Sequence, residues 1–164
     1  MKKSFAIVLS VLLAMVGCTS IECPIENTVY TTYTFENTDG TTGSLGTDTL
    51  TIKTRRVDGK DTTILNKMTG TENGFDLPIS YTQPEDILYF TLSTTAKKVY
   101  YDTVRIKKEN YPHFESVDCQ AAYFHKITAV MTTHNVIDSL VIYKSDVTYD
   151  ASTEHLHLYL KADR

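Results

Sequence analysis

The sequence has no tryptophan, and its 164 residues include only 7 Gly, 4 Pro and 3 Cys. So little glycine and proline excludes a collagen-like or low-complexity chain, and a hydrophobic share of 41% is sufficient for a folded core. A basic excess is also absent, because 20 acidic residues outnumber 16 Lys and Arg, which argues against nucleic-acid binding. The abundant residues are 26 Thr and 11 Tyr, which favour strands. We therefore expect an all-β protein.

The first 17 residues have the pattern of a lipoprotein signal peptide. Lys2 and Lys3 form a positive start, residues 5–16 are apolar, and residues 15–18 read Met-Val-Gly-Cys, which resembles the lipobox of bacterial lipoproteins. The apolar stretch is too short for a membrane span, which needs about 20 residues. We predict cleavage before Cys18 and lipidation of Cys18; the alternative is a soluble secreted protein. Cleavage removes both lysines and changes the net charge from −4 to −6.

The predicted organisation is a signal peptide at residues 1–17, a lipidated tether at 18–27 and a single β domain at 28–164. Once Cys18 is lipidated, Cys23 and Cys119 remain as a pair in an oxidising compartment, where such a pair usually forms a disulfide. In the chain-entropy model a loop of this length stabilises the fold by about 4–5 kcal/mol. The alternative is two free thiols in metal binding or redox chemistry, for which the chain lacks a Cys-x-x-Cys spacing.

Apolar and polar residues alternate with period two through most of the mature chain, and no window has helical spacing. Strands are expected at residues 28–36, around 50–52, and at 62–68, 87–93, 99–107, 122–124, 127–131, 136–143 and 155–160. Pro78 makes residues 75–79 an edge or short strand, and residues 108–118 are expected to form a loop. Asp58-Gly59 predicts a hairpin with a type I′ turn. Eight or nine such strands indicate an antiparallel β-sandwich.

Several short motifs lie along the mature chain. They are Cys23 soon after the lipobox, FDLP at 75–78, DTVRI at 102–106, FESVDC at 114–119 and THNVIDSL at 133–140. Together they resemble an uncharacterised family of Bacteroidota cell-envelope lipoproteins. The resemblance implies an envelope location, a compact β domain and pairing of Cys23 with Cys119. It implies no catalytic residue and no ligand.

His155 and His157 are the candidates for a metal site, because alternate residues of a strand project from one face and two imidazoles about 7 Å apart can share a metal. The further ligand would come from elsewhere in the chain, from His125, His134 or Asp150. The alternative is that His155, His157 and Tyr159 form the solvent-facing side of a strand whose leucines face the core. We favour this alternative and predict no metal or other cofactor.

Four segments have the pattern Asp, then Ser or Thr, then an aliphatic residue or Thr. This pattern is similar to the acceptor of the O-glycosylation system that Bacteroidota apply to exported proteins. The hydroxyls concerned are Thr49, Thr62, Thr103 and Ser139. The alternative is that Asp ends a turn and the following residues begin a strand.

A set of aromatic residues could stack on sugar rings, although packing within the sheet explains it as well. The set comprises Tyr100, Tyr101, Tyr111, His113, Phe114 and Tyr123. Phosphate-binding glycine loops and the Gly-x-Ser-x-Gly motif of hydrolases are absent. We therefore expect a non-enzymatic envelope lipoprotein on the periplasmic side of the outer membrane. It would bind another envelope component, a protein rather than a glycan, or support an assembly. A glycan-binding surface lipoprotein and a metal-binding protein or metal-dependent enzyme are the alternatives.

Overall fold

The computed structural model describes Cys23 and residues 28–164. The predicted signal peptide, the lipidation site Cys18 and the rest of the tether lie outside the described residues. The described part of the chain consists of strands, turns and irregular segments. Within that part, no helix is long and apolar enough to cross a membrane.

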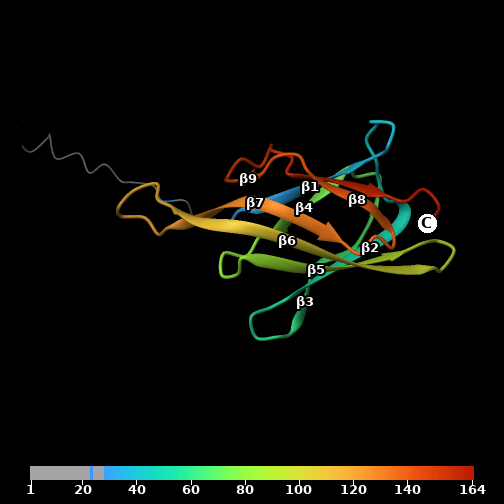
Figure 1. Ribbon diagram of the computed structural model, residues 1–164, viewed down its shortest axis with the longest axis horizontal. Coiled ribbons are helices and arrows are strands. Elements are labelled where there is room, and N and C mark those ends of the chain that lie inside the picture. The colour runs from blue at the N-terminus through green and yellow to red at the C-terminus, as the bar shows by residue number, and fades with distance from the viewer. Residues whose placement is uncertain (1–22, 24–27) are drawn as a thin grey trace, which may run out of the picture.

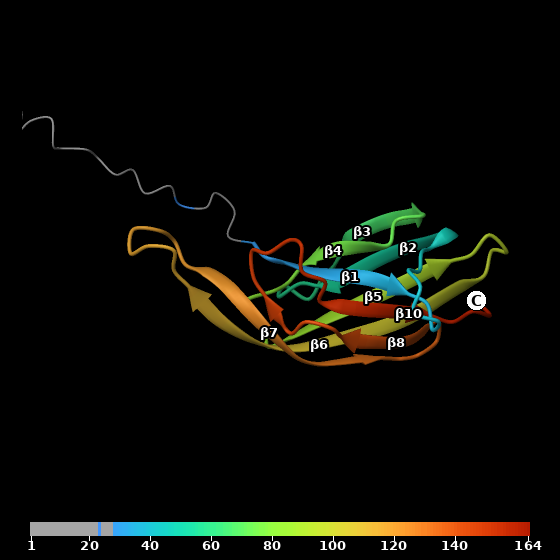
Figure 2. The same cartoon turned by 90° about the horizontal axis from the view of Figure 1, so that it is seen from above.

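Within residues 28–164, ten strands form two sheets packed face to face, shown from two sides in Figures 1 and 2. The strands are β1 (Tyr30–Glu36), β2 (Gly46–Arg55), β3 (Asp61–Gly70), β4 (Gly74–Pro78), β5 (Glu85–Ser93), β6 (Val99–His113), β7 (Ala122–Thr132), β8 (Ile137–Ile142), β9 (Asp146–Val147) and β10 (Leu156–Leu160). The smaller sheet has the order β4-β1-β10-β8 and the larger one β3-β2-β5-β6-β7-β9. Neighbouring strands are antiparallel except β1 and β10, which are parallel. The predicted β-sandwich is confirmed.

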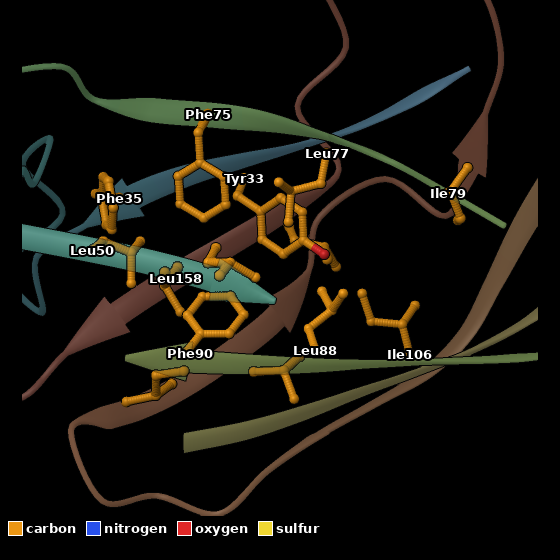
Figure 3. Close-up of a cluster of buried hydrophobic side chains, with 14 of the residues drawn as sticks. Tyr33, Phe35, Leu50, Phe75, Leu77, Ile79, Leu88, Phe90, Ile106 and Leu158 are labelled. Carbon is orange, nitrogen blue, oxygen red and sulfur yellow. The ribbon is translucent and has the colours of Figure 1, made fainter. Parts of the chain in front are cut away.

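The core lies between the sheets, because alternate residues of each strand point inward. In β5, for example, Leu88, Phe90 and Leu92 are buried, whereas the residues between them are only partly buried. Aromatic rings from both sheets meet near the centre (Figure 3). Tyr33 stacks on Phe75 with ring centroids 4.9 Å apart, and Phe75 lies 6.4 Å from Phe90 of the opposite sheet. These contacts connect the two layers and add to the stabilisation from apolar burial.

The longest strand, β6, corrects the sequence interpretation. The prediction of a loop is wrong for residues 108–113, because β6 continues to His113 and pairs with β7 along this stretch. Its inward positions there hold Lys108 and Asn110, and these polar residues interrupt the apolar alternation on which the prediction depended. The two short segments predicted at 122–131 form one strand, β7, and the two-residue strand β9 is too short for any alternation to predict it.

Two smaller predictions have mixed outcomes. The strand that ends at Pro78, β4, lies at the edge of its sheet as predicted. The hairpin at Asp58-Gly59 also forms, but the type I′ turn is wrong, because only Gly59 has a positive φ, of 78°. The amide of Gly59 donates to the carbonyl of Arg56, and the amide of Arg56 donates to the carbonyl of Lys60. This is a three-residue loop in which a turn is followed by one left-handed glycine.

Asp102 is a buried carboxylate on β6 that holds the connection between β7 and β8. Its Oδ1 accepts hydrogen bonds from the Thr133 hydroxyl (2.6 Å) and the Asn135 amide (2.8 Å). Its Oδ2 accepts from the amides of Val136 (2.7 Å) and Ile137 (2.9 Å). Burial opposes ionisation, but the four hydrogen bonds together outweigh it and lower the pKa of Asp102. The ionised carboxylate thus supplies partners for three backbone amides where the chain enters β8.

We predict that Asp102→Asn lowers the free energy of unfolding at pH 7 by about 2–4 kcal/mol, because an amide nitrogen would then face backbone N–H groups. Denaturant unfolding measures this loss, and Asp138→Asn at an exposed position of β8 is the control, with an effect within about 0.5 kcal/mol. Folding lowers the pKa of Asp102. Its contribution to the free energy of unfolding is therefore fully present above the pKa of the unfolded state and is lost as the pH falls through the pKa of the folded state. Equal losses in the two variants would contradict this role.

Candidate functional site

A buried ion pair lies beneath the connection between β4 and β5. Lys108, on the inward side of β6, has a side chain that is 0% exposed, and its Nζ lies 2.8 Å from Oδ2 of Asp86 on β5. The same oxygen accepts a hydrogen bond from the Ser80 amide at 3.2 Å. Burial raises the pKa of Asp86 and lowers the pKa of Lys108, while the contact between them opposes both shifts.

A second polar pair extends this cluster toward the β6–β7 hairpin. His125 of β7 is buried, and its Nδ1 lies 2.7 Å from Oδ1 of Asn110. The amide nitrogen of Asn110 donates to the carbonyls of Tyr81 and Gln83, so its oxygen must accept and Nδ1 of His125 carries the proton. These bonds attach the β4–β5 connection to β6. Burial, together with the nearby charge of Lys108, lowers the pKa of His125 to about 4.

The cluster of Asp86, Lys108, Asn110 and His125 was not predicted from the sequence. Ionisable groups with shifted pKa values occur in active sites, but they occur in structural networks as well. Here the ammonium group is fully buried against its carboxylate, and Asn110 and His125 bond to each other and to backbone carbonyls. The alternation of inward residues 104, 106, 108 and 110 along β6 is the signal that could have revealed it. This arrangement orients the β4–β5 connection and pairs each of its polar groups with another group of the fold.

Two hollows flank the β4–β5 connection, and both are lined in part by Ile79 and Ser80. The first, of about 570 Å³, lies between the edge strands β3 and β4, and we call it the edge hollow. Its apolar lining includes Val57, Ile64, Pro78, Ile79 and Leu88, and its polar lining includes Arg55, Arg56 and Asp86. A mainly apolar hollow with a few polar groups is typical of a binding site. The second hollow, of about 580 Å³, lies on the side of Tyr81, Tyr123 and His125.

The two cysteines predicted to pair do so. Cys23 and Cys119 form a disulfide with their Cα atoms 5.5 Å apart and 96 positions apart in the chain. Cys119 is buried in the connection between β6 and β7, so the bond attaches the segment before β1 to this hairpin. The lipidation of Cys18 stays a prediction.

The two candidate metal ligands lie in different environments. His155 is 1% exposed, so the prediction that it faces solvent is wrong. Its Nδ1 accepts a hydrogen bond from the Thr32 amide at 3.0 Å, where the chain enters β10, and burial lowers the pKa of its ring. His157 is half-buried, stacks on Tyr143 and lies 3.2 Å from Glu154. Among the described residues no group of three His, Cys, Asp or Glu could hold a metal ion.

The four predicted glycosylation hydroxyls lie within strands and are partly buried. They are Thr49 of β2, Thr62 of β3, Thr103 of β6 and Ser139 of β8. Asp102, which precedes Thr103, is buried and accepts four hydrogen bonds, so an enzyme could read that acceptor pattern only before the chain folds. Modification at these positions stays a prediction.

The predicted aromatic set is divided between the two ends of β6. Tyr100 and Tyr101 lie at its start, whereas Tyr111 and His113 lie at its end. There His113 stacks on Phe124 of β7 at 4.2 Å, and Tyr149 contacts the same ring edge-on at 5.0 Å. The set therefore does not form one face, and the grouping of Phe124 and Tyr149 at the end of the hairpin was not predicted.

Comparison with known proteins gives a family but no function. The sequence profile of a family of unknown function (DUF6452) matches residues 49–160, which is more than half of the chain. No curated protein and no solved structure matches significantly.

We predict that acid weakens the fold through His125. Its pKa is about 4 in the folded chain and about 6.5 in the unfolded chain, so the unfolded state binds more protons between these values. The free energy of unfolding is therefore unaffected by His125 above pH 6.5 and falls by up to about 3 kcal/mol as the pH drops to 4. Denaturant unfolding across this window measures the loss, which should be smaller in His125→Gln. If the free energy of unfolding falls equally with pH in the wild type and in His125→Gln, His125 does not cause the loss.

Proposed function

The chain belongs to this family of unknown function, DUF6452, and we propose that it is a lipid-anchored envelope protein whose sandwich binds another envelope protein without catalysis. The observation that carries the proposal is the Cys23–Cys119 disulfide. Disulfides form in oxidising compartments, so this bond agrees with the export signal and lipobox at the start of the chain.

The anchor in this proposal is the lipid on Cys18. Several acyl chains on one cysteine hold a protein durably on a bilayer, at about 0.8 kcal/mol for each buried methylene. Only four residues separate Cys18 from Cys23, and Cys23 is joined to the sandwich. The domain would thus stay close to the outer membrane, on its periplasmic side.

The edge hollow is the proposed binding surface. It lies between β3 and β4, which are edge strands of the two sheets, and an extended peptide can pair with an unpaired strand edge. The apolar side chains of Val57, Ile64 and Ile79 would receive the side chains of such a peptide. A protein is favoured over a glycan because the chain has no Trp, the residue with the largest stacking surface.

A non-enzymatic role is supported by how the buried ionisable groups are used. Asp86 and Lys108 neutralise each other, and His125 donates to Asn110. Asp102 is occupied by its four donors. Each of these groups therefore has a structural task within the described part of the chain.

The first test concerns the anchor. The protein expressed in its native envelope should fractionate with membranes and carry acyl chains on Cys18 in the mass of its N-terminal peptide. Cys18→Ala should abolish lipid incorporation and move the protein to the soluble fraction. Even a single myristoyl chain gives only marginal membrane binding, and this variant carries no acyl chain. Unchanged membrane association and no acyl mass in the wild type would contradict the anchor.

The second test concerns the edge hollow. We predict that a photo-crosslinking residue at Val57, which is 77% exposed and lines the hollow, gives an adduct with a specific envelope protein in intact cells. The matched control is the same residue at Val141, which is exposed on β8 and does not line the hollow. Adducts at Val141 alone or at neither position would contradict a protein-binding hollow, and an adduct with the mass of a sugar would favour the glycan alternative.

A further inference from the structure

The connection between β6 and β7 carries exposed apolar side chains at the end of the molecule to which Cys23 is joined. We call residues 114–121 the hairpin tip. Phe114 is 61% exposed and Val117 is 97% exposed. Figures 1 and 2 show the β6–β7 hairpin projecting past the other strands, at the end opposite the C-terminus. Cys119, within the hairpin tip, forms the disulfide with Cys23.

Covalent geometry places the lipid anchor near this tip. Five residue steps lead from Cys18 to Cys23, so their Cα atoms can be at most about 18 Å apart. Because the disulfide brings the Cα atom of Cys23 to 5.5 Å from that of Cys119, the acyl chains are tethered within this short reach of the hairpin tip. This placement of the acyl chains rests on the lipid anchor at Cys18 that we propose above.

Tyrosines surround the hairpin just behind its tip. Tyr111 and Tyr149 are partly exposed around Phe124. Tyr81 stacks on Tyr123 at 4.8 Å and is itself exposed. Tyrosine rings favour the boundary between lipid and water, because the ring is apolar and the hydroxyl is polar. A segment that enters a membrane interface is expected to have apolar side chains at its tip and tyrosines behind them, and this hairpin has that arrangement.

The charges near the tip indicate how it would bind. Residues 109–125 contain no Lys or Arg, and the acids at the tip are Glu115 and Asp118. Glu115 lies 3.1 Å from Nε2 of His113, and both acids are exposed. Attraction to anionic headgroups therefore cannot drive the contact, and the apolar and aromatic side chains must provide it.

We propose that the hairpin tip inserts Phe114 and Val117 into the interface of the bilayer that holds the Cys18 lipid. The sandwich then meets the membrane at a defined end. The edge hollow, which is lined by the β4–β5 connection and not by residues of the tip, stays available to its partner. The occupant of this apolar tip is thus phospholipid.

The absence of Trp makes the test direct, because Phe114→Trp introduces the only tryptophan. The lipidated mature variant is reconstituted in phosphatidylcholine vesicles in which part of the lipid is brominated on its acyl chains. Tyr101→Trp, exposed near the other end of β6, is the matched control, and Val117→Trp is a second tip probe should Phe114→Trp fold poorly. We expect bromolipid quenching at the tip to exceed that at residue 101 by about twofold or more, with a blue-shifted tip emission.

Flotation of the vesicles and the mass of the Cys18 peptide are measured in parallel, so the two proposals can fail separately. Protein that is lipidated and floats, but whose tip tryptophan is quenched no more than the control, overturns tip insertion and leaves the anchor intact. Protein without lipid on Cys18 overturns the anchor and the insertion with it. A tip tryptophan that is unquenched in vesicles but shielded in native envelope membranes shows that a protein covers the tip, and this also overturns the proposal.

Discussion

The disulfide between Cys23 and Cys119 is the constraint on which the proposed orientation of this molecule at a membrane depends. It joins positions 96 residues apart and fastens the segment before β1 to the far end of the β6–β7 hairpin. A bond that closes so long a loop removes much of the freedom of the unfolded chain, about 4–5 kcal/mol in the entropy model. It also decides which end of the sandwich lies nearest to Cys23. In our proposal the lipid anchor and the hairpin tip are linked through this bond.

Buried polar groups perform a second task, which is to hold the connections between strands. Asp102 gathers three backbone amides at the entry to β8, and the cluster of Asp86, Lys108, Asn110 and His125 holds the β4–β5 connection. A buried ion pair contributes little net stability, because desolvation of both charges offsets their attraction. Removing one partner is costly, however, so such groups select one arrangement of the loops. In this molecule that arrangement shapes the walls of both hollows.

The sequence predicted the fold where strands bury apolar residues and misjudged it where they bury polar ones. The alternation of Leu88, Phe90 and Leu92 marks β5 with nearly the observed bounds. Along β6 the same alternation continues through Lys108, whose burial depends on Asp86 in the neighbouring strand. His155 was misjudged for a related reason, because its ring accepts a hydrogen bond from Thr32 in a strand that begins more than a hundred residues earlier. A polar side chain is buried only if its partner is present, and that partner is distant in the sequence.

The sequence by itself determined the class of the fold, because a period-two pattern is a local property that each strand carries alone. It also contains the lipobox-like leader and, if Cys18 is lipidated as we propose, leaves one available disulfide pairing. Only the tertiary structure decided that β1 pairs in parallel with β10, that a hollow opens between β3 and β4, and that tyrosines from three separate segments surround one hairpin. These features arise from contacts between strands far apart in the chain, and their geometry exists only once the two sheets have packed together.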